Sequence, residues 1–511
     1  MTTDVNLATS RPLGVAENLL NSAVDERLVY SKTVVLTGEP EILLTQNGQW
    51  CFLDSLRLLT RIVGNLKVIL PHSNSEFFSE VSKFINNSWS IGPIELIDGD
   101  STSTPHNCDA ILSIGTKQND SLPWTVINSN GWVARVSSNN QSLSRDVTQA
   151  NPISALMAAS LGATEVFKRI FGVPDEVAPL MEKTEFSLFD LTDNPTSLGP
   201  ILPETIYLPD TLLVGAGAIG NGTALLMSQL PLNGRVYVID KQDYADENLG
   251  TCILINQDWL NEPKADQLGS WLKQNSSLDV SSKKALIESV KSELSNTNLA
   301  IDLILNGLDH VDARRSAQDI WPKIIIDGGI NEVVVAVVRY QLANENLACL
   351  KCWFELPATD EQQQQSAWTG LNVNDLDEIG RQLTEKDIAH ARDDKKAWLK
   401  QQLSEGKTIC SIISEAALAN KLGVEVTEGF RPSVPFVATA ASALIMTEAI
   451  KALIFPEAIT VPKFHIANLF IGINETAIKL SMMPISSCQC VKHRSLIKKI
   501  NEGRSPQNNA S

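Results

Sequence analysis

The stretch from Thr211 to Asp240, TLLVGAGAIGNGTALLMSQLPLNGRVYVID, decides the fold of this chain. A short apolar run, Leu212 to Val214, leads into a glycine-rich loop, and a helical pattern follows the loop. A second apolar run then ends at Asp240. This order of strand, tight turn, helix, strand and acid is typical of a nucleotide-binding α/β unit with a parallel sheet.

The glycines of the loop and the acid after the second strand have separate tasks in such a unit. Gly215 allows the tight turn, Gly217 lets the backbone approach a phosphate, and Gly220 lets the helix pack closely on the strand. Free N–H groups at the helix N-terminus attract the anion, and Asp240 is placed to bind a ribose hydroxyl. The pattern leaves open whether the nucleotide is NAD, FAD or ATP, and a glycine-rich turn without a ligand is the alternative.

The composition describes a globular, acidic protein. With 511 residues, 43% hydrophobic and 20% charged, the chain is long enough for about two or three domains. It has 42 Lys and Arg against 59 Asp and Glu, and the net charge of −17 disfavours non-specific binding to nucleic acid or to an anionic membrane. No apolar run approaches the roughly 18 residues of a membrane span. Since the N-terminus also lacks the features of a secretion signal, we expect a cytoplasmic protein.

Two α/β units follow one another in the sequence. We expect an amphipathic helix near residues 15–29, and a surface linker without clear periodicity at residues 172–210 between the units. In the first unit, residues 31–171, apolar runs alternate with helical patterns, which predicts a mainly parallel sheet. The expected strands of this sheet are Glu41–Thr45, Leu66–Leu70, Ala110–Ile114 and Thr125–Asn128.

The second unit repeats motifs of the first. CDAILSIG, with Asp109, parallels AIDLILNG, with Asp302. In the same way TEVFKRIF, from Thr164, parallels TEAIKALI, from Thr447. The spacing between the copies grows before the last helix, so we expect a duplicated fold with a large insertion in the second copy. Chance similarity between two α/β units is the alternative.

The first copy lacks the phosphate-binding turn. ILLTQNGQWCFLDSLRLL aligns loosely with TLLVGAGAIGNGTALLMS. In this alignment Gln46 stands at the position of Gly215 and Cys51 at that of Gly220, and only Gly48 remains a glycine. We therefore predict two Rossmann-like parallel-sheet units, of which the first is degenerate and the second holds the live nucleotide site.

Residues beyond the second strand of the live copy suit ATP better than a dinucleotide. Asn248 and Lys264 lie in a loop and helix after Asp240, where a lysine can pair with phosphate. Asp309 follows the apolar run 303–305, at the carboxyl edge of the sheet where ligands bind and where an acid is a natural Mg²⁺ ligand. Lys264 alone would more often be a solvated surface lysine. ATP chemistry needs both the lysine and the metal-binding acid, and NAD chemistry needs neither.

A set of motifs occurs in the order found in one family. The motifs are VGAGAIG, VID, ENL, NEPKAD, LDHVDARR, DGG and CLKC, and the likeness runs from about Thr211 to Cys490. Together they resemble the ThiF/MoeB superfamily, and especially its ubiquitin-activating branch. The resemblance implies that MgATP activates the C-terminal glycine carboxylate of a ubiquitin-like protein as an acyl-adenylate. It also implies that the dead and live units pair as an intramolecular pseudo-dimer.

The resemblance assigns a role to each residue of the live site. The phosphates bind Gly215, Gly217 and Gly220, the ribose binds Asp240, Asn248 orients the nucleotide, Lys264 neutralises phosphate charge, and Asp309 binds Mg²⁺.

One position departs from the family pattern. The family has Asn-Arg-Gln after Asn-Leu, whereas Asn-Leu at 248–249 is followed here by Gly-Thr-Cys at 250–252. The family arginine contacts phosphate, so either another arginine substitutes for it or adenylation is weak. The candidates are Arg27, Arg314 and Arg315.

Four of the eight cysteines form two tight pairs. Cys349 and Cys352 form CLKC, and Cys488 and Cys490 form CQC with His493 close by. Two such pairs, outside a disulfide framework, favour a tetrahedral structural Zn²⁺ site that ties the C-terminal segment to the root of the insertion. Replacement of one thiol by His493, a redox pair, or simple core packing are the alternatives.

The insertion, residues 351–431, lies where ubiquitin activators carry a catalytic cysteine domain. Cys410 matches the family nucleophile by position, close to Lys407 and just before a helical run. A helix N-terminus and a nearby cation lower the pKa of a thiol and so favour the reactive thiolate. The alternative is a buried structural cysteine beside Ile409 and Ile412.

These inferences give a domain plan and a function. The plan is a degenerate adenylation-like domain at 1–190, an active adenylation domain at 191–350 and 432–495 with the zinc-site closure in its last part, a catalytic-cysteine insertion at 351–431, and a disordered tail at 496–511. The predicted enzyme adenylates a ubiquitin-like protein, forms a thioester on Cys410 and passes the protein to a conjugating enzyme. The rivals are a ThiF/MoeB-type adenylyltransferase that serves a sulfur carrier without a thioester relay, a nucleotide-binding scaffold, and an NAD-dependent oxidoreductase. The oligomeric state stays open, and a homo-oligomer is one option.

Overall fold

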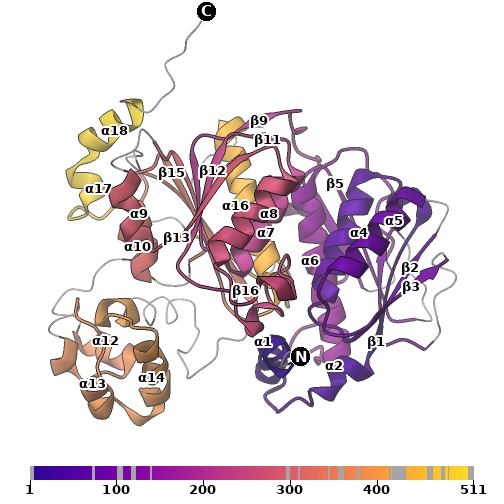
Figure 1. Ribbon diagram of the computed structural model, residues 1–511, viewed down its shortest axis with the longest axis horizontal. Coiled ribbons are helices and arrows are strands. Elements are labelled where there is room, and N and C mark those ends of the chain that lie inside the picture. Colours follow the sequence, from indigo (N-terminus) through magenta and orange to yellow (C-terminus); the bar gives the residue numbers. More distant parts are fainter. Residues whose placement is uncertain are drawn as a thin grey trace, which may run out of the picture.

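The structure is a computed structural model of the chain, in which two α/β units lie side by side and a small helical group lies apart from both sheets (Figure 1). The structure describes residues 5–503 except 72–74, 100–106, 117–121, 139–140, 295–299, 309–310, 343, 345, 355–361, 377–379, 414–415, 417–432, 457–463, 474–477 and 481–482.

The first unit begins with two helices and then alternates strands with helices. Its elements are α1 (Val5–Leu20), α2 (Arg27–Ser31), β1 (Thr33–Gly38), α3 (Pro40–Leu43), α4 (Gln46–Leu59), β2 (Asn65–Leu70), α5 (Ser75–Asn87), β3 (Ile94–Asp98), β4 (Ala110–Ile114), β5 (Trp124–Asn130), β6 (Val133–Ser137), α6 (Pro152–Phe171), β7 (Thr184–Ser187) and β8 (Thr192–Asp193).

The second unit contains the glycine-rich stretch and the insertion. Its strands are β9 (Ile206–Tyr207), β10 (Thr211–Val214), β11 (Leu232–Asn233), β12 (Arg235–Asp240), β13 (Asp279–Lys284), β14 (Leu303–Asn306), β15 (Ile324–Ile330), β16 (Val334–Gln341), β17 (Phe464–Asn468) and β18 (Ile478–Leu480). Its α-helices are α7 (Ala218–Gln229), α8 (Lys264–Asn275), α9 (Ile287–Leu294), α10 (Val311–Gln318), α11 (Leu350–Trp353), α12 (Gln362–Thr369), α13 (Glu385–His390), α14 (Lys396–Ser404), α16 (Pro435–Ile454), α17 (Gln489–Lys492) and α18 (Arg494–Gly503).

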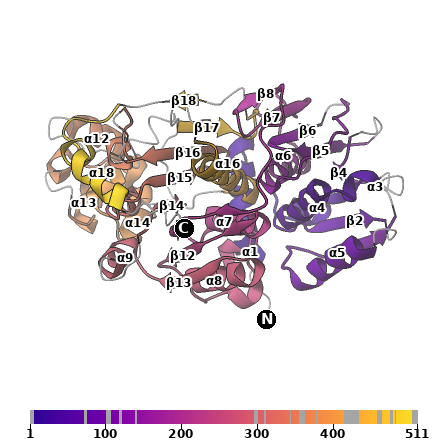
Figure 2. The same cartoon turned by 90° about the horizontal axis from the view of Figure 1, so that it is seen from above.

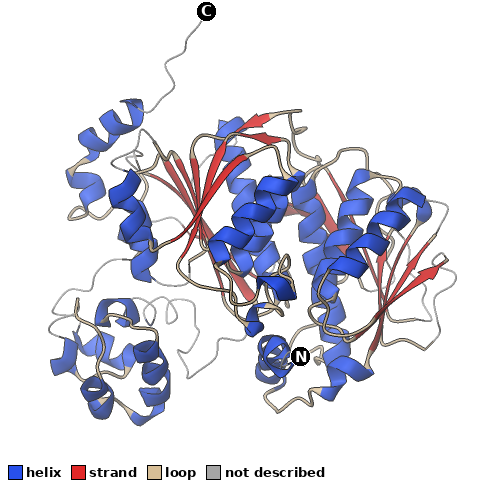
Figure 3. Ribbon diagram, in the orientation of Figure 1, coloured by secondary structure: helices blue, strands red, loops and turns tan. Residues whose placement is uncertain are grey.

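The two units have the same sheet topology. Each contains an eight-stranded sheet, and the strand orders are β3-β2-β1-β4-β5-β6-β7-β8 and β13-β12-β10-β14-β15-β16-β17-β18. Figure 3 shows the two sheets in red with helices around them. In both orders the first five strands are parallel and the last three alternate in direction. This confirms the predicted pair of Rossmann-like units. Residues 138–151 join β6 to α6, whereas the much longer segment 342–434 joins β16 to α16.

The two units meet through their long apolar helices. Figure 2 shows α6 and α16 side by side between the two sheets. The hydroxyls of Ser160 in α6 and Thr439 in α16 are hydrogen-bonded at 2.7 Å across this contact. Among the described residues, α16 is the one helix long and apolar enough to cross a membrane, and 83% of its apolar window is buried inside the protein. Its length and hydrophobicity therefore serve the shared core.

The insertion has a hydrophobic core of its own. Trp398 and Leu399 of α14 pack with Ile388 of α13 and with Ile409 and Ile412. All of these side chains are buried, and their cluster is separate from the cores of the two sheet units. The predicted helical insertion is confirmed, and it is held together by its own apolar contacts.

Four expectations about the ends and linkers are wrong. The run Glu41–Thr45 is not a strand, because Pro40 starts the short helix α3 and the strand lies earlier, at β1. Residues 172–210 are not a plain linker, since β7 and β8 complete the first sheet. The N-terminal helix runs from Val5 to Leu20 instead of 15–29. The tail is helical as far as Gly503, because α18 covers the first part of the segment expected to be disordered.

The alignment of the two glycine loops also needs correction by one helical turn. Thr45 is the N-cap of α4 and Gly217 is the N-cap of α7, so Gly48 and Gly220 are both third in their helices. A Cβ on Gly48 would lie 2.0 Å from the carbonyl oxygen of Ile42, and one on Gly220 would lie 2.0 Å from that of Gly215. Gly48 is therefore the counterpart of Gly220, and both glycines survive because the helix starts so close to the preceding backbone.

Candidate functional site

The glycine-rich turn of the second unit leaves space at the carboxyl end of β10. Gly215 has φ +91°, a left-handed conformation that favours glycine, and it lies against Gly307. A Cβ on Gly217 would meet no atom within 4 Å, whereas one on Gly220 would clash. The turn is thus closed on the side of the helix and open at Gly217, which is the arrangement that lets backbone N–H groups face an anion.

Asp240, the last residue of β12, supports the turn. One carboxylate oxygen accepts a hydrogen bond from the backbone N–H of Ala216 at 2.8 Å, and the other accepts one from Gln242 N–H at 2.8 Å. The carboxylate therefore fixes the turn at Ala216, and its remaining lone pairs are available to a ribose hydroxyl. The sequence pattern placed Asp240 correctly beside the turn, but it gave no sign of this supporting role.

Lys264 comes to the same side of the sheet from the first turn of α8. It is 7% exposed, and its ammonium donates to the side-chain carbonyl of Gln242 at 3.0 Å. The ammonium also lies 5.7 Å from the ring centre of Tyr244. Asn248 lies in the neighbouring loop, where its side-chain oxygen accepts from Ala245 N–H at 2.9 Å. The structure thus brings Asp240 and Lys264 together through Gln242, and it places Asn248 as a cap of its own loop.

Two further residues hold the turn and were missed by sequence reasoning. The Asn221 side-chain amide donates to the carbonyl oxygens of Ala216 and Gly217 at 3.0 and 2.9 Å. The buried Tyr244 hydroxyl also donates to Ala216, at 2.9 Å. The one available signal was a polar Asn221 inside an otherwise apolar helix, because such a residue needs a partner when it is buried.

Asp309, the proposed Mg²⁺ ligand, lies outside the described residues. The strand before it, β14, pairs with β10 and with β15, so Gly307 lies next to the glycine turn. Behind this point the carboxylate of Asp327 is buried and accepts from Asn306 at 2.7 Å and from Arg314 at 2.9 Å. Burial raises the pKa of Asp327, and the Arg314 guanidinium opposes that shift.

None of the three arginines expected to replace the family arginine points at the turn. Arg314 is bound to Asp327, and Arg315 donates to the backbone carbonyl of Phe354. Arg27 is exposed and pairs with Asp25 at 2.6 Å. Each of these guanidinium groups is held by a partner outside the loop of residues 247–252.

Arg11 of α1 lies beside the loop where the family arginine is missing. Its guanidinium pairs with Glu247 at 2.8 Å, next to Asn248. A Cβ on Gly250 would lie 2.0 Å from the carbonyl oxygen of Ala8, so α1 packs directly on this loop. No sequence signal pointed to Arg11, because its contact with the loop depends on how α1 folds back onto the second unit.

The corresponding edge of the first sheet is covered by its own chain. Segment 141–151 crosses this edge, where Asn47 donates to the carbonyl oxygen of Gln149 at 2.7 Å and Asn128 donates to that of Ser144 at 3.0 Å. The Glu39 carboxylate accepts from Thr116 N–H at 2.7 Å at the end of β1. At the edge that corresponds to the glycine turn of the second unit, the first unit thus has a carboxylate and a backbone segment of its own.

The two cysteine pairs form one compact group. The sulfurs of Cys349 and Cys352 are 3.7 Å apart, Cys349 and Cys488 are 3.6 Å apart, and Cys352 and Cys490 are 3.6 Å apart. All four sulfurs lie within 4.8 Å of one another. Sulfurs bound about 2.3 Å from a tetrahedral zinc ion are about 3.8 Å apart, so the group fits Zn²⁺. Among the described residues His493 is not part of this group.

The residue proposed as nucleophile, Cys410, lies in the first turn of a short helix that begins at Ile409. The residue is only 5% exposed. The expected nearby cation is neutralised, because the Lys407 ammonium binds Glu405 at 3.0 Å and Gln402 at 2.6 Å. The helix N-terminus that was expected at Cys410 is present, but Cys410 is buried.

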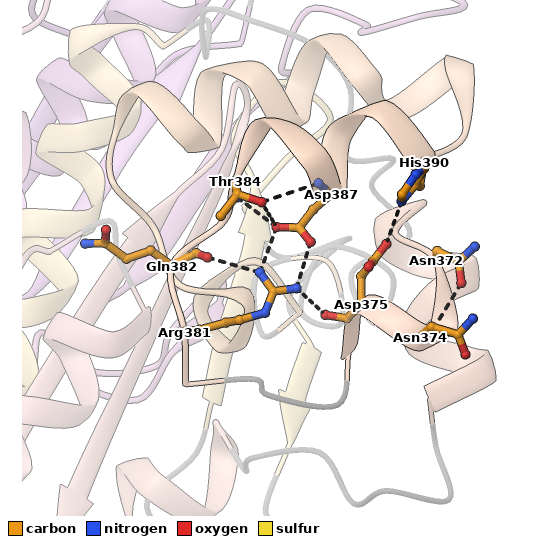
Figure 4. Close-up of polar contacts among 8 residues, drawn as sticks. All are labelled: Asn372, Asn374, Asp375, Arg381, Gln382, Thr384, Asp387 and His390. Atoms are coloured by element: carbon orange, nitrogen blue, oxygen red, sulfur yellow. Dashed lines mark hydrogen bonds and ion pairs between the residues drawn. The ribbon is translucent and has the colours of Figure 1, made fainter.

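A polar network of the insertion joins Arg381, Thr384 and Asp387 (Figure 4). Arg381 donates two hydrogen bonds of 2.7 Å to the carboxylate of Asp387, which also accepts from Thr384 (Figure 4). The Arg381 carbonyl oxygen in turn accepts from Ile409 N–H at 3.0 Å. Burial opposes ionisation of Asp387, but the hydrogen bonds from Arg381 and Thr384 lower its pKa to about 2. The network therefore fixes the segment from which the helix of Cys410 starts.

Comparison with known proteins agrees with the fold. A sequence model of the ThiF family matches residues 206–492, more than half of the chain, and a model described as the BilD N-terminal domain matches residues 33–180. An uncharacterized protein of Sinorhizobium fredii, y4jF, is 24% identical over 253 residues, which are 49% of this chain and 48% of that protein. The chain thus spans about half the length of this curated relative.

Solved structures of MccB from E. coli are also similar in part. MccB with ATP is 16% identical, and the match covers 55% of this chain and 66% of MccB with a TM-score of 0.33. MccB with MccA-N7isoASN is 15% identical, and the match covers 55% of this chain and 67% of MccB with a TM-score of 0.34.

Proposed function

The chain belongs to the ThiF family and has its adenylyltransferase-type fold, and on this basis we propose that it activates a ubiquitin-like protein with ATP. One observation carries the proposal. The open glycine turn at Gly217, the carboxylate of Asp240 and the ammonium of Lys264 lie together at one edge of the second sheet. This set supplies backbone donors, a ribose acceptor and a phosphate cation, which is what a nucleoside triphosphate needs.

In the first proposed step a carboxylate of the partner attacks the α-phosphate of ATP. A bond forms between carboxylate oxygen and phosphorus, and pyrophosphate leaves. The turn amides and Lys264 stabilise negative charge on the phosphates. Asp309 is the proposed ligand of the accompanying Mg²⁺, which neutralises phosphate charge when it is bound. Asn248 orients the nucleotide in this proposal.

We assign the role of the missing family arginine to Arg11. It is attached to the loop at Glu247, in place of the arginine that the family has where Thr251 stands. Burial raises the pKa of the Cys252 thiol, and the charges of Lys264 and Arg11 both oppose that rise. Arg11 reaches this loop from α1 through its ion pair with Glu247.

In the second proposed step the Cys410 thiolate attacks the acyl carbon of the adenylate. A thioester forms, AMP leaves, and the thioester then passes to the cysteine of a conjugating enzyme. Since Cys410 is 5% exposed, the insertion has to open around it before this step. The four-cysteine group takes a structural Zn²⁺ in this proposal, and the degenerate unit forms the other half of a pseudo-dimer. We place the enzyme in the cytoplasm.

The burial of Cys410 also favours a second candidate, which is adenylation without a thioester relay. In that case the adenylate would be used directly, as in ThiF/MoeB-type activation of a sulfur carrier. A further alternative is a scaffold that binds the nucleotide but transfers no adenylyl group.

The test uses the full chain with ATP, Mg²⁺ and a small ubiquitin-like protein that ends in glycine. We expect pyrophosphate exchange and an adduct that thiol reductants cleave. Cys410→Ala should abolish the adduct and keep the exchange, while Cys108→Ala, which removes a half-buried thiol of the first unit, should keep both. Exchange without any adduct would select the second candidate. Absence of exchange together with oxidation of added NADH would overturn both.

A further inference from the structure

A fully buried arginine of the first unit reaches into the second unit. Arg61 follows the end of α4 and is 1% exposed. Its terminal nitrogen Nη2 donates to the carbonyl oxygens of Ile253 and Ile255 at 3.3 and 2.9 Å. The guanidinium carbon also lies 4.9 Å from the ring centre of Trp89. Burial lowers the pKa of Arg61 to about 9, so the guanidinium is charged at pH 7.

The first unit holds the same segment at a second point. The backbone N–H of Trp89 donates to the side-chain oxygen of Asn256 at 3.1 Å. Next to Asn256 along the chain, Ile253, Leu254 and Ile255 are all buried. Carbonyl groups buried in this way need donors, and the first unit provides the donor for two of them.

The segment is joined in turn to the phosphate-binding turn. Leu254 N–H donates to the side-chain oxygen of Asn221 at 3.2 Å. The amide nitrogen of Asn221 donates to the carbonyl oxygens of Ala216 and Gly217. A continuous chain of hydrogen bonds therefore runs from Arg61, through residues 253–255 and Asn221, to the turn.

We propose that Arg61 is a positioning residue through which the degenerate unit sets the conformation of the phosphate-binding turn. The guanidinium holds the carbonyl groups on both sides of Leu254, which directs the Leu254 N–H at Asn221. Asn221 then has its oxygen satisfied and its amide turned toward Ala216 and Gly217. The degenerate unit would thus act on the nucleotide site without touching the nucleotide. The proposal rests on the proposed nucleotide site at that turn.

The chain offers a matched control in Arg57. Arg57 lies one turn earlier in α4, is partly buried, and stacks on Phe84 of its own unit at 4.7 Å. Arg57→Met and Arg61→Met each remove a guanidinium and an aromatic contact from the same part of the first unit. Only Arg61→Met removes donors to residues 253 and 255.

The experiment measures two quantities on the full chain with each variant. The first is the affinity for a non-hydrolysable ATP analogue with Mg²⁺, and the second is amide hydrogen exchange of the peptide containing residues 212–222 without nucleotide. We expect Arg61→Met to weaken binding about tenfold and to speed exchange of that peptide. Arg57→Met should change neither, even where its melting temperature falls as much. Arg61→Lys, which keeps a donor, should recover part of the affinity.

Each outcome decides the proposal. Normal affinity and normal exchange in a folded Arg61→Met variant would overturn it, and so would equal effects of Arg57→Met. If the wild-type chain binds no nucleotide, the proposed function fails, but faster exchange in Arg61→Met alone would still support the coupling. Unchanged exchange in that case would overturn the coupling as well.

Discussion

Lys168 and Lys451 make equivalent hydrogen bonds across the interface of the two units. Lys168 reaches from the first unit to the second, and Lys451 reaches from the second to the first. Lys168 Nζ donates to the carbonyl oxygen of Phe470 at 3.2 Å, and Lys451 Nζ donates to that of Phe189 at 2.8 Å. Each lysine stands three residues after a glutamate of its own helix and forms an ion pair with it. The duplicated TE-x-x-K pattern is therefore an interface motif, and it survives in both copies although the nucleotide turn survives in one.

Lys168→Met should lower the free energy of unfolding by about 3 kcal/mol, because Glu165 stays buried without its cation. Urea unfolding of the full chain measures this change. The double variant Glu165→Leu with Lys168→Met should recover much of the loss, since no unpaired charge remains. A single variant as stable as the wild type would show that the lysine contributes nothing to the interface.

The stability of the chain should depend on pH through Asp54. This carboxyl group is fully buried in α4 beside Gln229 of α7, which donates to it at 3.4 Å, and burial raises its pKa to about 7. The folded chain then holds this proton more tightly than the unfolded chain does. The contribution to stability is full below about pH 4 and is lost as pH rises to about 7, by on the order of 4 kcal/mol.

Asp54→Asn tests this dependence, because the amide keeps the shape and removes the titration. The difference in unfolding free energy between variant and wild type should grow in favour of the variant from pH 4 to pH 7 and stay constant above. Urea unfolding at several pH values measures it. A difference that does not change with pH would contradict the raised pKa.

The glycines of the two turns should respond differently to alanine. Gly217→Ala should fold normally, since its Cβ enters open space, and should weaken ATP binding about tenfold because that space is the proposed phosphate site. Gly220→Ala and Gly48→Ala should both destabilise the fold, because each Cβ would lie 2.0 Å from a carbonyl oxygen. Melting temperature and nucleotide affinity separate the effects. Unimpaired ATP binding by Gly217→Ala would place the nucleotide elsewhere.

The four-cysteine group should bind one zinc ion per chain. Elemental analysis of the purified chain measures the metal, and we expect Cys352→Ser to lose it. Gln318→Leu is a finer test, because Gln318 donates to the sulfur of Cys349 at 3.2 Å and accepts from Lys351 N–H at 3.0 Å. That variant should keep the zinc but release it about tenfold faster to a chelator. A metal-free chain with an unchanged melting temperature would contradict the site.

The Cys410 thiol should react slowly with alkylating reagents while the insertion is closed. Asp387→Asn removes the carboxylate that binds Arg381 and Thr384, so it should loosen the segment before Cys410 and speed its alkylation about tenfold. Asp394→Asn, which breaks an exposed ion pair with Arg392 in the same insertion, should leave the rate unchanged. Mass spectrometry of the peptide with Cys410 gives the rate. Equal rates in all three proteins would show that this network does not cover the thiol.

The sequence was sufficient where a local pattern decides the structure. The run from Leu212 to Asp240 has strand, turn and helix signals in one uninterrupted order, and β10, α7 and β12 follow it. The four cysteines were likewise recognisable as two pairs, and the fold brings them together. Such features depend on neighbouring residues, and the physical rules for neighbours are strong.

The sequence was insufficient where distant segments meet. Arg11 and Arg61 contact residues far along the chain, and nothing near them in the sequence indicates those contacts. The polar Asn221 in an apolar helix signals that it needs a partner, but the sequence does not name Leu254 as that partner. The false strand at Glu41–Thr45 had a different cause. Its apolar residues are compatible with a short helix as well as with a strand, and Pro40 favours the helix.

Under the proposed function, the covered edge of the first sheet limits how many substrates one molecule can activate at a time. A homodimer of identical subunits presents two equivalent clefts and needs a ligand to make them differ. Here segment 141–151 closes one cleft within the same polypeptide that carries the other. The amino-acid sequence itself therefore leaves one active site for every two sheet units. Each chain would consume one ATP per cycle, however many copies of the chain associate.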